Sequence, residues 1–385
     1  MAAPSRPLAF PTMPTTTTTT TRPRRDALPD DAARLLARFG LTLDGLLTVG
    51  ASNAKLAKGA ADAWPVILHH LPARALAAAV AGPDDATTAP RSRLPGIAEL
   101  ARANGIENLA LAHNGCPWAS KGCQAGCLAW AGHGGLSTTV AAARARRTLA
   151  FVWNHKGYAV AVLVAIARQW QRAQAKGQPL AVRLRGTDDL PWHDLRFNLN
   201  DGEAAAIAHR YGLPVAPGIG TTISEALSLA PAGTIRQYEY SKAPVDGPMG
   251  LRAQRSAGID VTASLAADRP GGLAHALQAV AAGFRLAVPV AIKKGQPLPP
   301  VLLLRNGDTI ARLLVVDGDT TDNRWQDPAG PQPAGFDGVA VLLRTKRSRG
   351  ATTAAAAFSL APTIGQWQPL AGGGHAALST TAWEG

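Results

Sequence analysis

Cysteine is almost absent from this sequence: the 385 residues include only three, Cys116, Cys123 and Cys127. An odd number of cysteines in one short segment excludes a disulfide-stapled scaffold and favours thiolate ligands in a reducing compartment. We therefore expect a cytoplasmic protein whose three cysteines bind one metal centre. The simpler alternative is that they are free thiols, which pack in a core as small hydrophobic side chains.

Long apolar runs are also missing. Arg, Asp or Gly interrupts each alanine-rich segment before about 18 apolar residues accumulate, which excludes a membrane-spanning helix and, with it, a membrane partner. The N-terminal segment contains Pro, Thr and Arg but lacks the apolar core of a secretory signal. We interpret residues 1–30 as a disordered leader, because a Pro/Thr-rich segment has too little apolar surface to join a core.

Acidic residues are scarcer than basic ones, 26 against 39, which gives a net charge of +13. An excess of cations permits a polyanionic partner, either a nucleic acid or a nucleotide. Most of the excess is arginine, and the compositional bias of an Ala- and Arg-rich genome explains it equally well. The sequence has no Walker loop, GxGxxG fingerprint, HExxH helix or GxSxG elbow, so nucleotide hydrolysis, classical dehydrogenase chemistry and serine hydrolysis lack their usual motifs.

Apolar strand-like runs alternate with amphipathic stretches from residue 97 onward, a pattern typical of strand–helix–strand units. We expect strands at 108–113, 180–186, 236–241, 259–266, 285–292, 309–319 and 338–345, and a long helix at 138–176 that bends near Asn154. These units predict an α/β protein whose parallel strands form a full or partial (β/α) barrel. A doubly wound open sheet is the alternative.

The expected organisation has four parts. They are a disordered leader (1–30), a helical N-terminal extension and loop (31–96), a barrel-like metal-binding domain (97–346) and an irregular Ala/Gly-rich tail (347–385).

The cysteines follow the spacing C-x6-C-x3-C, and the Gly and Pro residues between them let the backbone fold around a bound centre. Three thiolates can hold three irons of a [4Fe–4S] cluster and leave the fourth iron open for a small molecule. They can also bind Zn²⁺, with His133 or His113 as the fourth ligand. The sequence leaves both open. The position after the predicted strand at 108–113, where an active site is expected, favours iron–sulfur.

Polar residues crowd the end of the predicted strand at 180–186. Arg183 and Arg185 alternate along it and so share one face, where their guanidinium groups suit a substrate carboxylate or phosphate. In the turn that follows, one of two adjacent carboxylates can hold an ammonium group or transfer a proton. Its candidate catalytic residues are Asp188 and Asp189. A helix-capping turn explains the same residues.

Later strand ends repeat this pattern. Lys242 and Asp268 each follow a predicted strand and are candidate substrate-binding residues. Asp317 and Asp319 flank a glycine at another strand end and are candidate catalytic residues on the far wall of the pocket. Asp-Gly is also a strong turn signal, so a solvent-exposed hairpin turn is the alternative for this pair.

Four segments together resemble a family carried by phages, plasmids and bacterial chromosomes. They are SNAKLAKG (52–59), CPWASKGCQAGCLAWAGHG (116–134), VRLRGTDDLPWHD (182–194) and VVDGDTTDNRWQDPAG (315–330). The cysteine layout is also similar to that of the mycobacteriophage gene product 88 family, and the likeness covers about residues 45–346. This family brings no activity that can be carried over.

The cysteine loop and the turn at 186–189 also resemble those of radical S-adenosylmethionine enzymes. The resemblance implies a [4Fe–4S] cluster on the three cysteines, with S-adenosylmethionine at the open iron of the cluster. It also implies that Gly186, Thr187 and Asp188 of the turn are cofactor-binding residues, which hold the ammonium group of S-adenosylmethionine. The sequence departs from that pattern, which has C-x3-C-x2-C and a second glycine in the turn. The hypothesis is an enzyme that acts on a nucleotide or nucleic-acid base. The alternative is a zinc-stabilised nucleic-acid-binding protein without catalytic activity.

Overall fold

The computed structural model describes residues 28–50, 54–81, 94, 96–125, 127, 137–293, 295–328, 335–345, 359–361 and 364–380. Most of the expected leader (1–27) and the candidate zinc ligand His133 lie outside these residues.

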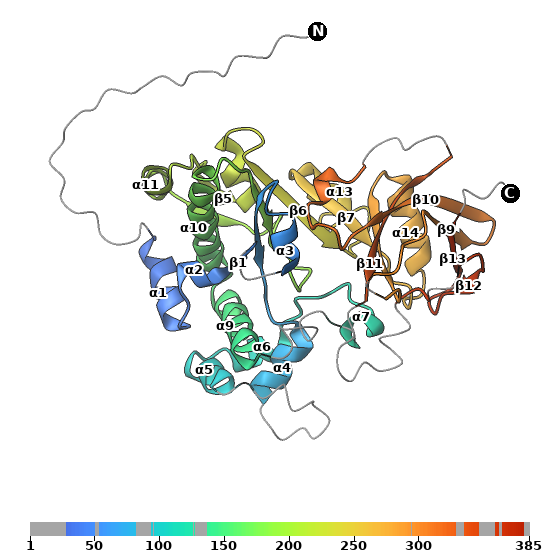
Figure 1. The fold of residues 1–385 in the computed structure, drawn as a ribbon. Helices are drawn as coiled ribbons and strands as arrows, with labels where there is room; N and C mark the ends of the chain where they lie inside the picture. The colour runs from blue at the N-terminus through green and yellow to red at the C-terminus, as the bar shows by residue number, and fades with distance from the viewer. Residues whose placement is uncertain are drawn as a thin grey trace, which may run out of the picture.

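An open sheet of 11 strands runs through the described part of the chain (Figure 1). Its strand order is β1-β2-β3-β6-β7-β8-β11-β10-β9-β13-β12. Six neighbouring strands are parallel and follow one another in chain order: β2 (Trp64–Leu68), β3 (Leu180–Arg183), β6 (Ile235–Ser241), β7 (Ile259–Ser264), β8 (Arg285–Val290) and β11 (Gly338–Arg344). Their C-terminal ends therefore lie along one edge of the sheet, which we call the carboxyl edge.

The sheet continues beyond both ends of this parallel block. β10 (Thr309–Asp317) is parallel to β11, whereas the other additions are antiparallel: β1 (Leu47–Val49), β9 (Val301–Asn306), β12 (Gln368–Pro369) and β13 (His375–Ser379). A separate hairpin joins β4 (Phe197–Leu199) to β5 (Gly218–Thr221). Among the described residues β1 pairs only with β2 and β12 only with β13, so the sheet keeps two free edges. The mixed α/β class with a mostly parallel sheet is confirmed; a closed barrel is not.

The helices before the second parallel strand are α1 (Asp30–Arg38), α2 (Leu43–Leu46), α3 (Ala54–Lys58), α4 (Ala73–Ala81), α5 (Ile97–Ala103), α6 (Glu107–Ala112), α7 (Lys121–Ala125), α9 (Thr138–Trp153) and α10 (His155–Gln174). Those after it are α11 (Asp201–Tyr211), α12 (Ile223–Ala226), η4 (Leu227–Leu229), α13 (Leu251–Ser256), α14 (Gly272–Ala281) and η5 (Arg324–Gln326). No helix in this part of the chain is long and apolar enough to cross a bilayer.

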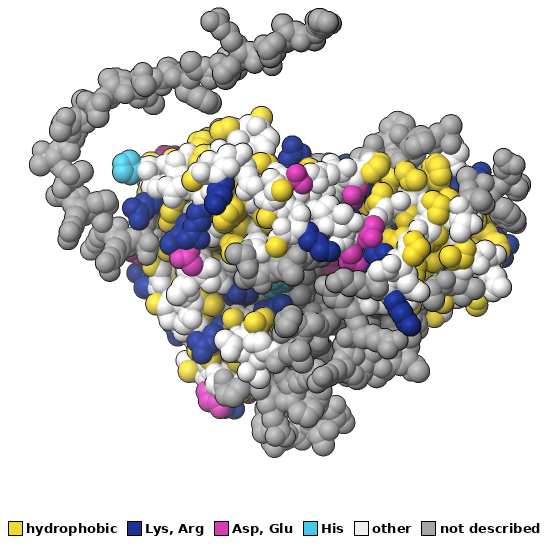
Figure 2. Space-filling model, viewed as in Figure 1, with side chains coloured by type: hydrophobic (Ala, Val, Ile, Leu, Met, Phe, Trp, Pro, Cys, Tyr) yellow, Lys and Arg dark blue, Asp and Glu magenta, His cyan; other side chains and the backbone are white. Residues whose placement is uncertain are grey.

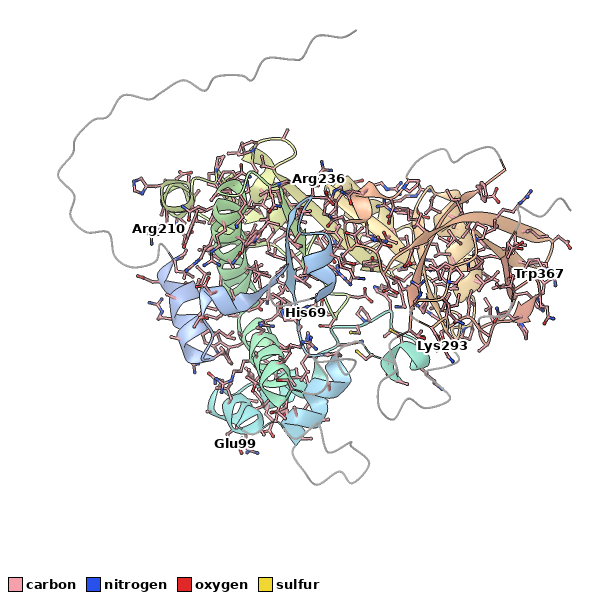
Figure 3. The ribbon with its side chains drawn as sticks, in the orientation of Figure 1. His69, Glu99, Arg210, Arg236, Lys293 and Trp367 are labelled. Carbon is pink, nitrogen blue, oxygen red and sulfur yellow. The ribbon has the colours of Figure 1, made fainter. Side chains whose placement is uncertain are left out.

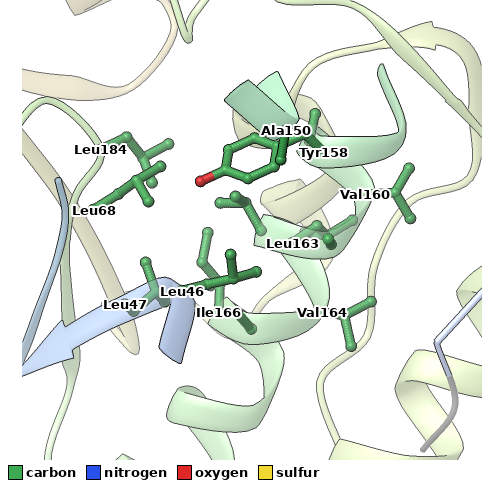
Figure 4. Packing of buried hydrophobic residues seen from close by; sticks show 14 of the residues in the cluster. Leu46, Leu47, Leu68, Ala150, Tyr158, Val160, Leu163, Val164, Ile166 and Leu184 are labelled. Carbon is green, nitrogen blue, oxygen red and sulfur yellow. The ribbon is translucent and has the colours of Figure 1, made fainter. Parts of the chain in front are cut away.

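Helix α10 is the centre of the larger hydrophobic core. It is apolar on nearly all sides because α1, α2, α9, α11 and the first strands surround it. Figure 4 shows Tyr158 of this helix near Ala150, with its hydroxyl directed toward Leu68 and Leu184. Asn154 separates α9 from α10, and its side chain accepts a hydrogen bond from the Gly157 amide at 3.0 Å. The predicted bend in the long helix is therefore confirmed, since an N-cap starts a new helix there.

The two faces of the sheet differ. Leu180 and Val182 of β3 belong to the core around α10, whereas Ala181 between them packs with Tyr238 and Trp325 on the opposite face. The alternation follows from the two-residue period of a strand. That opposite face, which we call the inner face, is covered at β3 and β6 by the segment 321–327.

Three sequence predictions about elements are wrong. Residues 108–113 lie in and just after helix α6, because a short apolar run does not distinguish a strand from a helix. The first parallel strand is instead β2, whose Pro-Val-Ile-Leu run lies in a segment expected to be helical. The C-terminal tail was expected to be irregular, yet β13 pairs with β9 and its central residues are buried.

Candidate functional site

The cysteine loop begins against the turn that follows β3. The Asp189 amide donates a hydrogen bond to the Gly115 carbonyl at 2.7 Å. The Cys116 thiol donates to the Thr187 carbonyl at 3.7 Å. Because β3 ends at Arg183, Cys116 lies at the carboxyl edge of the sheet.

Cys123 is attached to a different strand end. It lies in helix α7, where its amide donates to Ser120 Oγ at 3.1 Å and the preceding Gly122 amide donates to Asp268 Oδ2 at 2.7 Å. Asp268 follows β7. Asp268, which the sequence predicted to bind substrate, therefore contacts the cysteine loop in this structure.

The three thiols lie close enough to influence one another. Burial raises the pKa of the Cys116 thiol, and the charges of Asp188, Asp189, Cys127 and Cys123 raise it further. All three cysteines are partly exposed. Within the described ranges, however, no three His, Cys, Asp or Glu side chains are grouped to hold a metal ion. The thiols are thus neighbours that do not surround one common point.

A lysine and a carboxylate complete this part of the site. Burial lowers the pKa of Lys242, but the adjacent Cys123 and Asp189 outweigh burial and the net pKa is raised. Lys242 also forms a hydrogen bond with the Cys123 side chain. Burial raises the pKa of Asp189, and Lys242 and Arg185 partly offset the increase. Asp189 and Lys242, both partly exposed, therefore lie near each other as opposite charges beside the thiols.

Arg185 is a buried cation with weak partners. Its side chain contacts Ser241 Oγ and His193 Nδ1, each at 3.4 Å, and its Nε has no hydrogen-bond partner. The residue is 2% exposed and forms no ion pair with a carboxylate in the described part of the chain. A buried guanidinium group normally has a carboxylate or phosphate partner. Arg185 is therefore available to an anionic ligand.

Glu239 fixes the backbone beside that guanidinium group. Its carboxylate accepts hydrogen bonds from the Leu184 and Arg185 amides, with distances of 2.7–3.2 Å. Burial raises the pKa of Glu239 to about 7, although Arg185 and Arg183 partly offset the increase.

Asp188 contacts a buried histidine. His70 Nδ1 lies 3.0 Å from Asp188 Oδ2, and His70 Nε2 lies 3.2 Å from the Tyr158 hydroxyl. The other carboxylate oxygen accepts from the Leu190 amide at 3.0 Å. Trp192 stacks on the imidazole ring with a centroid distance of 6.0 Å. With both oxygens occupied, Asp188 orders the turn, whereas Asp189 lies near Lys242 and the thiols.

Gly186 and Thr187 hold the turn against the end of β2. A Cβ at Gly186 would lie 2.5 Å from the Leu68 carbonyl oxygen and 2.6 Å from Ile67 Cγ2. Only glycine permits this approach, which lets the Gly186 amide donate to Leu68 at 2.9 Å. The Thr187 hydroxyl donates to the His70 carbonyl at 2.6 Å. In this structure both residues contact protein groups, where the sequence suggested cofactor-binding residues.

The predicted common face for Arg183 and Arg185 is wrong. Arg183 contacts Asp322 at 3.4 Å and lies 4.6 Å from the centre of the Tyr240 ring, on the inner face. Arg185 contacts Ser241 and His193 instead. The strand ends at Arg183, so the two-residue alternation does not extend to Arg185.

Asp317, the last residue of β10, and Asp319 lie in a turn that hydrogen bonds hold in place. Both Asp317 oxygens accept from Arg344 Nη1 at 2.8 Å, and the Asp319 amide donates to Asp317 Oδ1 at 2.9 Å. Lys58 donates to the Asp319 carbonyl at 2.7 Å. These contacts are the ones expected if the two acids form a turn, which was the alternative interpretation of their sequence. Within the described ranges, neither acid is joined to the cysteine loop by a hydrogen bond or an ion pair.

Two adjacent histidines near the turn, His69 and His70, were missed by the sequence analysis. His69, labelled in Figure 3, follows β2 and has a buried Nδ1 without a hydrogen-bond partner. Burial lowers the pKa of His69 well below its usual value, and the nearby Arg144 and Arg183 lower it further. His113 Nε2 is likewise buried without a partner. The signal for His69 was two adjacent histidines after a buried apolar run, which the helical interpretation of that segment concealed.

A family model described as Gene product 88 matches residues 52–358. This chain belongs to the Gene product 88 family. The family predicted from the sequence is thus confirmed. The matched range contains every site residue described in this subsection, from Lys58 to Arg344. No match was found among curated proteins or among solved structures.

Proposed function

We propose that this protein is an iron–sulfur enzyme of the radical S-adenosylmethionine type that acts on a nucleotide or nucleic-acid base. The observation that carries the proposal is the position of three neighbouring thiols at the carboxyl edge of a block of parallel strands, beside the opposite charges of Asp189 and Lys242 and a buried arginine whose Nε has no hydrogen-bond partner. Active sites of parallel α/β proteins collect at this edge.

Three neighbouring thiols suit a cluster. A [4Fe–4S] cluster binds each thiolate through a different iron, so three thiolates leave the fourth iron open to a ligand. Cys116, Cys123 and Cys127 are neighbours that influence one another's charge. Because burial favours the neutral thiol of Cys116, a bound cationic centre would have to stabilise the thiolate.

The charges beside the thiols suit an amino-acid group. Asp189 can accept an ammonium group, and the unpartnered Nε of Arg185 can donate to a carboxylate. The two side chains are close enough that Arg185 lowers the pKa of Asp189. A carboxylate and a guanidinium group placed together in this way match the zwitterion of an α-amino acid, which is the methionine part of S-adenosylmethionine.

The chain's own residues orient the ligand and hold the site in place. When bound, the cluster supplies an electron, received from a low-potential one-electron donor, for reductive cleavage of a sulfonium carbon–sulfur bond. Lys242 fixes Asp189 and Cys123 relative to each other. Asp188, His70 and Gly186 hold the turn that carries Asp189.

The substrate class rests on charge. A net charge of +13 favours a polyanionic substrate over a neutral one. On the face drawn in Figure 2, the described Lys and Arg side chains lie in separate small groups. Support for a nucleotide or nucleic-acid substrate therefore comes from the overall charge.

The test is S-adenosylmethionine binding and cleavage by anaerobically reconstituted protein. We expect dithionite-dependent formation of 5′-deoxyadenosine and methionine, with Asp189→Asn and Arg185→Met each weakening S-adenosylmethionine binding at least about tenfold, the equivalent of one charge-assisted hydrogen bond. Asp201→Asn, on the distant helix α11, is the matched control and should bind normally. Loaded protein that neither binds nor cleaves S-adenosylmethionine refutes the proposal. One zinc per chain instead of iron would support the nucleic-acid-binding alternative.

A further inference from the structure

We infer that Asp268 is a positioning residue that fixes Cys123 relative to Cys116 by tying the cysteine loop to the end of β7. Its relevance to a metal centre rests on the proposed function, but the inference itself concerns the geometry of the loop. The backbone of the loop is attached at β3 and at β7, and Asp268 makes the second of these attachments through its side chain; the Lys242 side chain contacts that of Cys123 as well.

The first attachment is at β3. The Asp189 amide and the Thr187 carbonyl bind Gly115 and Cys116. This contact is made by backbone atoms of the turn, so it places Cys116 independently of any side chain on β7.

The second attachment is at β7. Asp268 Oδ2 accepts from the Gly122 amide at 2.7 Å, one residue before Cys123. Its Oδ1 is buried and has no hydrogen-bond partner in the structure. In the sheet, β6 lies between β3 and β7. The two attachments are thus separated by one strand, and the distance between the strand ends sets the separation of the first two thiols.

The local cap of α7 cannot perform this role. Ser120 Oγ accepts from the Cys123 amide at 3.1 Å, which stabilises the first turn of the helix. Ser120 belongs to the loop itself, however, and moves with it. Asp268 is the described residue whose side chain joins the α7 backbone to another strand end.

The experiment measures alkylation of each cysteine in the full-length, metal-free, reduced protein, by mass spectrometry of peptides after timed exposure to iodoacetamide. In Asp268→Ala, we expect Cys123 to react about three- to tenfold faster, the effect of losing one capping-type hydrogen bond, while Cys116 reacts as in the wild type. Asp268→Asn retains a carbonyl oxygen that can accept from Gly122 and should restore slow alkylation. Circular dichroism confirms that each variant is folded.

Asp337 provides the matched control. Its Oδ2 also accepts a backbone amide hydrogen bond at 2.7 Å, from Arg312, but away from the cysteine loop. Asp337→Ala should leave the alkylation rate of Cys123 unchanged. Equal Cys123 rates in Asp268→Ala and wild type, or an equal increase at Cys116, would overturn the inference.

Hydrogen exchange in the wild-type protein is a second test that needs no variant. The Gly122 amide should exchange at least about tenfold more slowly than the amide of the exposed Lys121 in the same loop, because Asp268 accepts its hydrogen bond. Unprotected exchange at Gly122 would contradict the attachment. Neither measurement uses a metal. A protein that fails to bind iron would therefore refute the proposed function while leaving this inference to be decided by alkylation and exchange.

Discussion

Replacing Asp188 with alanine should destabilise the protein strongly, because this carboxylate is a structural centre of the turn. Its side chain is 1% exposed and binds two partners, His70 Nδ1 and the Leu190 amide, each at 3.0 Å. Leaving one buried polar partner unsatisfied costs about 1–3 kcal/mol. Two such losses predict a decrease of about 2–6 kcal/mol in the free energy of unfolding, before any cavity is counted.

Urea denaturation followed by tryptophan fluorescence measures this effect, since Trp192 stacks on His70. The matched control is Asp189→Asn at the adjacent position. Among the described residues the Asp189 carboxylate accepts no hydrogen bond, and burial already raises its pKa. Its replacement should therefore change stability by less than about 1 kcal/mol. Equal destabilisation by the two variants, or an unchanged urea midpoint for Asp188→Ala, would refute the division of roles between these acids.

Three further predictions concern other parts of the site. Because the pKa of Glu239 rises from 4.5 to about 7 on folding, the folded state holds the proton more tightly, so stability falls as pH rises from 4.5 to about 7. Glu239→Gln should remove this loss of stability. Denaturant titrations at alkaline pH should then give a free energy of unfolding about 3 kcal/mol higher than that of the wild type. Parallel profiles of stability against pH for the variant and the wild type would contradict this prediction. Asp317→Asn should lower stability by less than about 1 kcal/mol and leave metal content unchanged, because its pair with Arg344 is partly exposed; loss of iron in this variant would place Asp317 at the metal centre. Gly186→Ala should cost about 1–3 kcal/mol by urea denaturation, since its Cβ would overlap Leu68, and a neutral result would show that the two strand ends can separate.

Periodicity predicted much of the parallel sheet. The strands beginning at Leu180, Ile235, Ile259 and Arg285 were expected within a few residues, because β-branched runs bounded by turn residues are specific to buried strands. The first strand was misassigned. Trp64–Leu68 has only five residues, and the alanine-rich segments around it favour helix.

The sequence analysis also identified the segments that meet at the site, but it could not assign a contact to each side chain. The cysteine loop and the 186–189 turn do meet, since both occupy the carboxyl edge. Which of the two adjacent carboxylates is held by a buried partner depends on His70, a residue 118 positions away from Asp188. No local pattern encodes that pairing. The position of Arg183 likewise depends on Asp322, which reaches the inner face only after the chain has crossed the whole sheet.

Metal content tests the central claim most directly. The account predicts that anaerobically purified full-length protein is brown and contains about four iron and four acid-labile sulfide per chain after reconstitution. Cys116→Ala, Cys123→Ala and Cys127→Ala should each reduce both values sharply, whereas Asp317→Asn should not. Colourless protein with one tightly bound zinc, or with no metal at all, would contradict the iron–sulfur centre.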